Sequence, residues 1–388
     1  MTAPARTGLP GEGGIGPGRR DAAAREQLAA MPSGKTVVTC TAAPGSGGLG
    51  RHMQEILDAL GRAGQPAVGL SGAQRGSAGS ARHVLGVPYL TSFLRALPLP
   101  TSVGVRTAAA MIEFDAYAAA RLPEAEHLIA FNSQALRQLS AARRARYESV
   151  ALVSANPHLR LLRRRHELAR RAYPLEGSWA SRLLERNLAE YAEADRIYVA
   201  SRYVRESFLE QGVREEVLCD FPLTPHPRYS AVGERVVSER FEVVYVGSLS
   251  VHKGVPLLID AVRALPGLDM TLRLVGGWGT PGMRKFVQRA CAADPRIVVS
   301  PGDPLPWLRG AGVCVHPAYE DGFAYAPAEA LAVGVPVIVS EDTGMKELIS
   351  PDRDGLVLAT GDLGALTEAI EAACRGELWA TGSRSHDG

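Results

Sequence analysis

Two patterns of apolar and polar residues alternate along the chain. Short, nearly continuous apolar runs such as Val37–Cys40 and Phe241–Val246 are separated by segments with helical spacing, such as Arg51–Arg62, whose apolar residues fall on one face. Continuous apolar runs are typical of strands that are buried on both faces of a parallel sheet. Strands that alternate with helices in this way predict a doubly wound α/β fold.

The most informative stretch of the sequence runs from Cys314 to Ile349. It predicts a strand at Gly312–His316, a loop at 319–324, a helix at 326–333 and a second buried strand at 335–340. In a parallel sheet built from such units, ligands bind at the carboxyl ends of the strands. We therefore expect the chemistry of the protein in this loop and at the start of this helix.

Two acidic residues stand out there, Asp321 in the loop and Glu329 in the helix. Gly322 allows the backbone to approach a ligand closely, and the N–H groups at a helix start favour an anion such as a phosphate. A carboxylate beside a phosphate site usually accepts hydrogen bonds from sugar hydroxyls. On spacing alone, an ordinary turn and a solvated helix position explain these two acids equally well.

This stretch resembles the donor-binding signature of family 4 of the GT-B glycosyltransferases, the glycosyl transferases group 1. In that signature an acid and a Glu are separated by seven residues, as Asp321 and Glu329 are, and a helix of small residues leads to Gly-x-Pro-Val, which matches Gly334–Val337. The family normally has Glu in the first acidic position. Glu320 lies one position out of register, so Asp321 is the predicted site residue.

A second match follows the strand at Phe241–Val246. The family usually has Gly-Arg-Leu, three residues and Lys-Gly in this loop, and both basic side chains hold the diphosphate of the donor. Lys253 takes the lysine position, whereas Ser248 takes the arginine position. A lysine just beyond a strand end also suits charge stabilisation as a sugar leaves. One expected positive charge is therefore missing from this chain.

Two weaker matches lie in the first half of the chain. The glycine-rich turn Pro44–Gly50 resembles the loop that brings a helix start to the donor phosphates and the acceptor, with Gly48 as the predicted residue, but a glycine cluster alone is weak evidence. His158 follows a predicted strand and matches a histidine near the donor sugar. A lone histidine is more often a structural residue.

The resemblance implies the fold and the activity. We expect a GT-B fold with two Rossmann-like doubly wound domains facing each other across a donor/acceptor cleft. The implied activity is retaining transfer of a sugar from a UDP- or GDP-linked nucleotide sugar, with no metal and no other cofactor. The implied catalytic residues are His158, Asp321 and Lys253, and the implied donor-binding residues are Gly48, Ser248, Lys253, Gly322, Phe323, Ala324 and Glu329.

The resemblance also implies a role for each of these groups. Lys253 and the N–H groups of residues 322–324 would hold the diphosphate and the sugar, and Asp321 would orient the sugar hydroxyls. Glu329 would accept hydrogen bonds from the ribose hydroxyls, and His158 would assist at the sugar from the opposite domain. No enzyme nucleophile is implied, because the acceptor attacks the face that the leaving group vacates.

Composition favours a protein of the reducing cytoplasm of a bacterium. The chain has 388 residues, of which 46% are hydrophobic and 22% charged, and its net charge of +2 gives no reason to expect nucleic acid. Its five cysteines form no CxxC pair, so neither a zinc site nor a disulfide framework is predicted. No run approaches the roughly 18 apolar residues of an integral membrane segment. Arginine strongly outnumbers lysine, as in proteins of GC-rich bacteria.

The predicted organisation has five parts. They are a disordered leader at 1–34, an N-terminal Rossmann-like acceptor domain at 35–220, a proline-rich linker at 221–236, a C-terminal Rossmann-like nucleotide-sugar domain at 237–375 and a flexible tail at 376–388. Relatives usually add helices after the last of these domains, and this chain ends soon after it.

Three readings of an arginine concentration at residues 143–171 stay open. It suits a solvated helix face, a site for an anionic acceptor, or a patch that makes peripheral contact with an acidic membrane. The lack of interleaved aromatic residues argues against stacking on nucleic acid bases. The expected partners are thus a nucleotide sugar donor and a small-molecule or glycan acceptor, and the absence of a membrane segment favours a soluble acceptor.

The positions at which this chain departs from the family pattern suggest an alternative function. Ser248, Asp321 and the early chain end also suit a catalytically weak GT-B relative that binds a nucleotide sugar or a partner. A phosphorylase or a sugar epimerase of the same fold fits less well.

Overall fold

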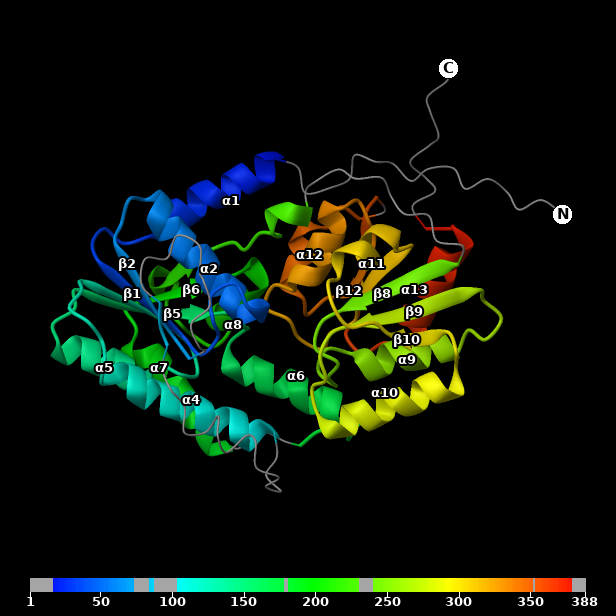
Figure 1. Cartoon of the computed structure of the whole chain (residues 1–388), viewed down its shortest axis with the longest axis horizontal. Coiled ribbons are helices and arrows are strands. Elements are labelled where there is room, and N and C mark those ends of the chain that lie inside the picture. Colours follow the sequence, from blue (N-terminus) through cyan, green and yellow to red (C-terminus); the bar gives the residue numbers. More distant parts are fainter. Residues whose placement is uncertain are drawn as a thin grey trace, which may run out of the picture. The chain divides into compact units, whose positions relative to one another are not determined.

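The computed structural model describes residues 17–72, 84–86, 103–177, 181–229, 240–351 and 353–378. The chain divides into two compact units (Figure 1). Among the described residues, the N-terminal unit comprises those within 21–164 and 181–223 together with residue 177, and the C-terminal unit comprises those within 17–20, 165–176 and 224–378. Residues 230–236 of the predicted linker and 379–388 of the predicted tail lie outside the described residues.

The N-terminal unit is built on a parallel sheet of seven strands in the order β3-β2-β1-β4-β5-β6-β7. The strands are β1 (Thr36–Cys40), β2 (Ala67–Ser71), β3 (Val84–Gly86), β4 (His127–Phe131), β5 (Ser149–Ser154), β6 (Arg196–Val199) and β7 (Leu218–Asp220). The helical elements between them are α2 (Gly47–Arg62), α4 (Val103–Ala119), α5 (Leu136–Arg144), α6 (Leu159–Ala172), α7 (Ser181–Glu193), α8 (Arg202–Leu209) and the short η1 (Glu215–Val217).

The C-terminal unit has a parallel sheet of six strands in the order β10-β9-β8-β11-β12-β13. The strands are β8 (Phe241–Val246), β9 (Met270–Val275), β10 (Ile297–Val299), β11 (Val313–His316), β12 (Val337–Ser340) and β13 (Gly355–Leu358). The helical elements are η2 (Pro227–Tyr229), α9 (Val255–Arg263), α10 (Pro281–Ala293), α11 (Leu305–Gly310), α12 (Tyr325–Ala332), η3 (Gly344–Leu348) and α13 (Leu363–Arg375). Both sheets confirm the predicted doubly wound α/β class.

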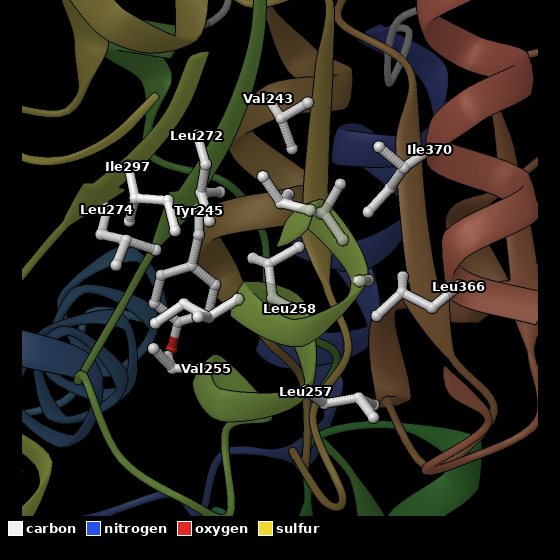
Figure 2. Packing of buried hydrophobic residues seen from close by; sticks show 14 of the residues in the cluster. Val243, Tyr245, Val255, Leu257, Leu258, Leu272, Leu274, Ile297, Leu366 and Ile370 are labelled. Carbon is white, nitrogen blue, oxygen red and sulfur yellow. The ribbon is translucent and has the colours of Figure 1, made fainter. Parts of the chain in front are cut away.

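The core of the C-terminal unit explains why its strands read as continuous apolar runs. Figure 2 shows Leu258 of α9 among side chains of the central strands, such as Val243 and Leu272, and Leu366 and Ile370 of α13 beside them. Each of these side chains is at most 1% exposed. Burying an aliphatic side chain of this size contributes about 2 kcal/mol, so the sheet and its helices stabilise each other.

The strand order places a topological switch point between β8 and β11. From β8 the chain moves outward through β9 and β10, then crosses back to β11 and continues through β12 and β13. Ligands of open α/β sheets bind outside the carboxyl ends of the strands at this point. The loops that follow β8 and β11 are therefore the expected binding loops of this unit.

The prediction of a disordered leader does not hold for Pro17–Ala30, which form helix α1. Most of this segment consists of Ala, Arg, Glu, Gln and Leu, which are strong helix formers. In the N-terminal unit the amide of Gln27, which is 3% exposed, donates to the carbonyl of Pro222 at 2.7 Å and to Glu55 at 3.2 Å. These contacts give the helix a fixed place that its composition did not indicate.

Residues 165–176 also differ from the predicted division, because they group with the C-terminal unit rather than with the domain predicted at 35–220. Ala169 is completely buried in the core of that unit, and Tyr173 and Leu175 pack against it. The hydroxyl of Tyr173 donates to Oδ2 of Asp260 at 2.8 Å. The arginine concentration at residues 143–171 did not indicate which surface covers this helix.

Candidate functional site

Lys253 lies in the loop after β8, at the switch point of the C-terminal sheet. Its Nζ atom is 2.9 Å from Oδ2 of Asp321 and donates to the carbonyl of Glu320 at 3.0 Å. Gly254, the next residue, has a φ of +73°, and a Cβ there would lie only 1.9 Å from the carbonyl oxygen of Pro317. A side chain at residue 254 would thus push apart the loops that bring Lys253 and Asp321 together.

Asp321 is held by three groups. Besides the contact with Lys253, Oδ2 accepts from Nε2 of His316 at 3.0 Å, and Oδ1 accepts from the N–H of Ala324 at 2.9 Å. Burial alone would raise the pKa of Asp321, but Lys253 and His316 outweigh it and hold the pKa well below its usual value. Asp321 is therefore an anion at any physiological pH.

Lys253 is the matching cation. Burial would lower its pKa, but the charges of Asp321 and Glu320 outweigh that effect and raise the pKa above the usual value of a lysine. The ring of His316 stacks on that of Tyr245, with 5.9 Å between centroids and 3° between planes. The site thus presents a fixed positive charge beside a fixed negative charge at the ends of two adjacent strands.

The loop that carries Asp321 is fixed by its own backbone. The N–H of Asp321 donates to the carbonyl of Asp342, and the carbonyl of Asp321 accepts from the N–H of Gly344 at 2.9 Å. Ala324, the residue that caps α12, has a left-handed φ of 65°, which is rare for a residue with a side chain. Its N–H, predicted to contact the donor, donates to Asp321 in this structure.

Glu329 lies on α12 with only 2% of its surface exposed. Burial would lower the pKa of Arg228, but Tyr229, Asp303 and the charge of Glu329 together raise it. The guanidinium of Arg228 donates to both carboxyl oxygens of Asp303, at 2.9 and 3.3 Å. Sequence reasoning missed Arg228, because nothing within a proline-rich segment sets one arginine apart.

Ser248 is exposed at the start of the same loop as Lys253. Its carbonyl accepts from the hydroxyl of Tyr245 at 2.8 Å, whereas its side chain has no hydrogen bond within the part of the chain that the structure describes. The backbone of Ser248 is therefore held in place, whereas another side chain could replace the serine hydroxymethyl group without breaking a hydrogen bond among the described residues.

The two predicted residues of the N-terminal unit have contrasting surroundings. Gly48 is exposed in the first turn of α2, with open space where a Cβ would be, whereas a Cβ on Gly50 would lie 2.0 Å from the carbonyl oxygen of Ala43. His158 is 4% exposed, and its ring lies 5.0 Å from that of Tyr191. Burial, helped by nearby arginines, lowers the pKa of His158 to about 4, so its ring is neutral at pH 7.

The structure thus brings together three of the predicted residues, Lys253, Asp321 and Ala324, at the carboxyl ends of β8 and β11. It also adds His316, which sequence reasoning missed although it is the last residue of its strand. Such an arrangement can bind an anionic group at Lys253 and hydroxyl groups at Asp321. Among the described residues, no three His, Cys, Asp or Glu side chains are grouped to hold a metal ion. No helix in the described ranges combines the length and the apolar character that a membrane crossing requires.

Sequence comparison places this site within a known family model. Residues 240–375 match the model of the glycosyl transferases group 1. The chain is 30% identical over 137 residues to the lipopolysaccharide core biosynthesis mannosyltransferase LpsB of Rhizobium meliloti, covering 32% of this chain and 39% of the relative. It is 26% identical over 142 residues to the capsular polysaccharide biosynthesis glycosyltransferase CapM of Staphylococcus aureus, covering 35% of this chain and 37% of the relative.

A shorter match, 40% identical over 55 residues, is to GDP-mannose:glycolipid 4-beta-D-mannosyltransferase of Xanthomonas campestris and covers 14% of this chain and 16% of the relative. The aligned region therefore spans less than two fifths of each of these curated relatives.

Solved structures resemble the chain over most of its length. Sucrose-phosphate synthase from Thermosynechococcus elongatus superposes with a TM-score of 0.67 at 18% identity, covering 89% of this chain and 91% of that one. Anabaena Alr3699/HepE in complex with UDP superposes with a TM-score of 0.62 at 16% identity and the same coverage. At these identities the similarity establishes the fold.

Proposed function

We propose that the protein is a retaining glycosyltransferase, because residues 240–375 match the model of the glycosyl transferases group 1 and the chain has the GT-B fold. It moves a sugar from a UDP- or GDP-linked nucleotide sugar to a small-molecule or glycan acceptor in the cytoplasm of a bacterium. Either UDP or GDP can be the nucleotide of the donor in this proposal, since one structural neighbour is a complex with UDP and one relative is named for GDP-mannose.

The ion pair between Lys253 and Asp321 is the observation that carries this proposal. It lies at the switch point of the sheet, where nucleotides bind in open α/β folds, and the buried Glu329 follows in the helix after the same loop. In the proposed complex Lys253 holds the diphosphate, Asp321 orients sugar hydroxyls and Glu329 accepts from the ribose. The exposed Ser248 borders the diphosphate.

The rate is proposed to come from positioned charge. As the bond from the anomeric carbon to the diphosphate oxygen breaks, negative charge grows on the diphosphate, and the nearby ammonium of Lys253 stabilises it. The acceptor oxygen attacks from the face that the leaving group vacates and gives its proton to the diphosphate. Lys253 supplies the charge that a metal ion supplies in other transferases, so transfer should persist in excess EDTA.

The proposed roles of the N-terminal unit are limited to two residues. Gly48 leaves the start of α2 open to an anion, and His158 assists at the sugar as a neutral imidazole, since burial lowers its pKa to about 4. Neutral imidazole can accept or donate one hydrogen bond to a sugar hydroxyl.

Thermal unfolding with UDP, GDP, TDP and ADP tests the proposal. At a hundredfold excess over its dissociation constant, the correct nucleotide should stabilise the protein by about 2.7 kcal/mol. The effect should vanish in Glu329→Ala and in Lys253→Ala and persist in the exposed control Lys285→Ala. Transfer is then measured with sugars linked to the bound nucleotide, with and without EDTA.

A second candidate function is binding without efficient turnover. Ser248 leaves the loop after β8 with one basic residue where the family has two. This reading predicts a nucleotide-dependent thermal shift but no transferred sugar with any donor in the panel. Failure of every nucleotide to stabilise the wild type would contradict both candidates.

A further inference from the structure

His166 touches the residues next to both partners of the Lys253–Asp321 pair. Its ring stacks on that of His252, with 4.4 Å between centroids and 20° between planes, and its Nε2 donates to Oε2 of Glu320 at 3.3 Å. His252 directly precedes Lys253, and Glu320 directly precedes Asp321. One imidazole, 154 residues away from Glu320 in sequence, therefore contacts both binding loops of the C-terminal unit.

Arg165, the preceding residue, acts on a third loop. Its Nη2 lies 2.9 Å from Oδ1 of Asp342, which is 3% exposed. The carbonyl of Asp342 accepts from the N–H of Asp321 at 3.0 Å, and its Oδ2 accepts from the hydroxyl of Thr360 at 2.6 Å. Arg165 thus fixes the backbone group that holds Asp321 from the side of β12.

The Glu320 carboxyl depends on His166. Glu320 is 1% exposed, and its Oε1 is buried with no hydrogen-bond partner among the described residues. The bond from His166 to Oε2 is therefore the one side-chain hydrogen bond that the Glu320 carboxyl makes within the part of the chain that the structure describes. A buried polar group that loses its hydrogen-bond partner is destabilised, which favours a local rearrangement. The carbonyl of the same residue accepts from Lys253, so a shift of Glu320 would move that ammonium.

The segment around these two residues is anchored well enough to act as a support. Ala169 is fully buried in the core of the unit, and Tyr173 donates to Asp260 at 2.8 Å. A Cβ on Gly282 would lie 2.3 Å from the carbonyl oxygen of Leu175, so the backbone of the segment lies directly against α10. The backbone that carries the His166 ring is thereby fixed against the rest of the unit.

We propose that His166, assisted by Arg165, is a positioning residue of the donor site: it holds Glu320 and His252 in place and thereby sets the geometry of Lys253 and Asp321. The inference rests on the proposed function, in which Lys253 binds the diphosphate and Asp321 orients the sugar. Neither His166 nor Arg165 lies within residues 240–375, so the family match does not include them.

Two substitutions at residue 166 separate positioning from packing. His166→Phe keeps a ring against His252 but cannot donate to Glu320, whereas His166→Gln keeps a donor and loses the ring. We expect His166→Phe to weaken the binding of UDP or GDP about tenfold and to lower kcat/KM for the donor at least as much, through KM and kcat together. His166→Gln should remain within about threefold of wild type. Arg171→Ala, an exposed arginine of the same helix, is the matched control and should equal wild type.

Calorimetric titration with UDP and GDP, steady-state kinetics and thermal unfolding are measured on all four proteins. Wild type that binds no nucleotide would overturn the proposed function and this inference with it. If wild type binds UDP or GDP and His166→Phe binds it with the same affinity, this inference alone would be overturned. Equal losses in the Phe and Gln variants would refute a role for the hydrogen bond. If His166→Phe does not fold, Arg165→Ala replaces it, and unaltered nucleotide affinity in that variant would overturn the proposal.

Discussion

The Nζ atom of Lys253 lies 2.9 Å from Oδ2 of Asp321, so the cation proposed to bind the donor is already paired with an anion of the protein. A nucleoside diphosphate must compete with Asp321 for this ammonium, whereas a complete nucleotide sugar also brings hydroxyl groups that the carboxylate can bind. If the protein has the proposed function, we therefore expect the pair to favour the intact donor over the spent nucleotide, which would help product release.

Asp321→Asn tests this competition. We expect the variant to bind UDP or GDP about threefold to tenfold more tightly, because Lys253 loses its competing anion, and to transfer sugar at least about a hundredfold more slowly. Asp269→Asn, on an exposed aspartate of the same unit, is the control. Tighter nucleotide binding with normal turnover would show that Asp321 does not act on the sugar, and weaker nucleotide binding would refute the competition.

The same pair should contribute to stability. Lys253→Met leaves a largely buried carboxylate without its main partner and should lower the free energy of unfolding by about 3 kcal/mol. The double variant with Asp321→Asn should lose less than the sum of the two single variants, because the uncompensated charge is gone. Urea unfolding of the four proteins measures the coupling, and strictly additive losses would show that the contact is not formed in solution.

The pKa of Asp321 sets the pH dependence of this contribution. A carboxyl whose pKa is lower in the folded state stabilises the protein above the unfolded pKa of about 3.9, and the stabilisation is lost as pH falls below that value. Wild type should thus lose stability faster than Asp321→Asn on acidification below pH 4.

Ala324 should be strained, because it has a φ of 65° at the start of α12. Ala324→Gly removes the clash of Cβ with the backbone but gives the unfolded chain more freedom, so we expect a net gain of about 0.5–1 kcal/mol in the free energy of unfolding. Ala326→Gly, inside the same helix, should instead lose about 1 kcal/mol. Equal losses in the two variants, measured by denaturant unfolding, would show that residue 324 is not strained.

His52 should make the N-terminal unit sensitive to acid. Its ring lies between Phe131 and Phe221, its two nitrogens are buried without a hydrogen-bond partner among the described residues, and burial lowers its pKa to about 3. The unfolded chain binds a proton near pH 6.5 and the folded chain does not, so stability falls as pH drops from 6.5 toward 3.

At pH 5 the expected loss from this one group is about 2 kcal/mol relative to pH 6.5 and above. Burial lowers the pKa of His158 to about 4, so this residue also makes the protein less stable as pH falls below 6.5. His52→Phe should therefore reduce the slope of stability against pH between 6.5 and 5, as measured by urea unfolding at each pH. An unchanged slope would mean that His52 is solvated in solution.

The local pattern of the sequence was sufficient for the elements that carry the site. The strand ending at His316, the helix with Glu329 and the strand that follows appear as β11, α12 and β12, because apolar runs and Gly-Pro breaks specify them within a few residues. Their order along the chain also fixed the parallel topology, since short connections and right-handed crossovers leave few alternatives.

Side-chain partners from distant parts of the chain could not be predicted in the same way. The first N–H groups of α5 are capped by the buried carboxylates of Asp115 and Glu190, with Arg186 joined to both. No pattern around α5 indicates these caps. The contacts of His166 with Glu320 have the same origin, because they depend on which helix covers which loop after folding. Sequence reasoning therefore located the elements on either side of these loops but not the residues that hold the loops in place.

Ser248 offers a direct test of whether the missing basic residue limits nucleotide binding. Its backbone is fixed by the bond from Tyr245 to its carbonyl, and its side chain is exposed, so a longer side chain can be added without disturbing the loop. Ser248→Arg places a second positive charge near Lys253 and should tighten the binding of UDP or GDP about tenfold at low salt.

The gain from Ser248→Arg should shrink as salt is raised, because the added charge is exposed. Ser248→Gln, which adds length without charge, should bind like wild type. Calorimetric titration at two salt concentrations measures the affinity, and the donor turnover of each variant is compared. Equal gains in the Arg and Gln variants would show that size rather than charge is responsible. No gain in either would mean that residue 248 does not face the diphosphate, and that Lys253 alone neutralises it in this chain.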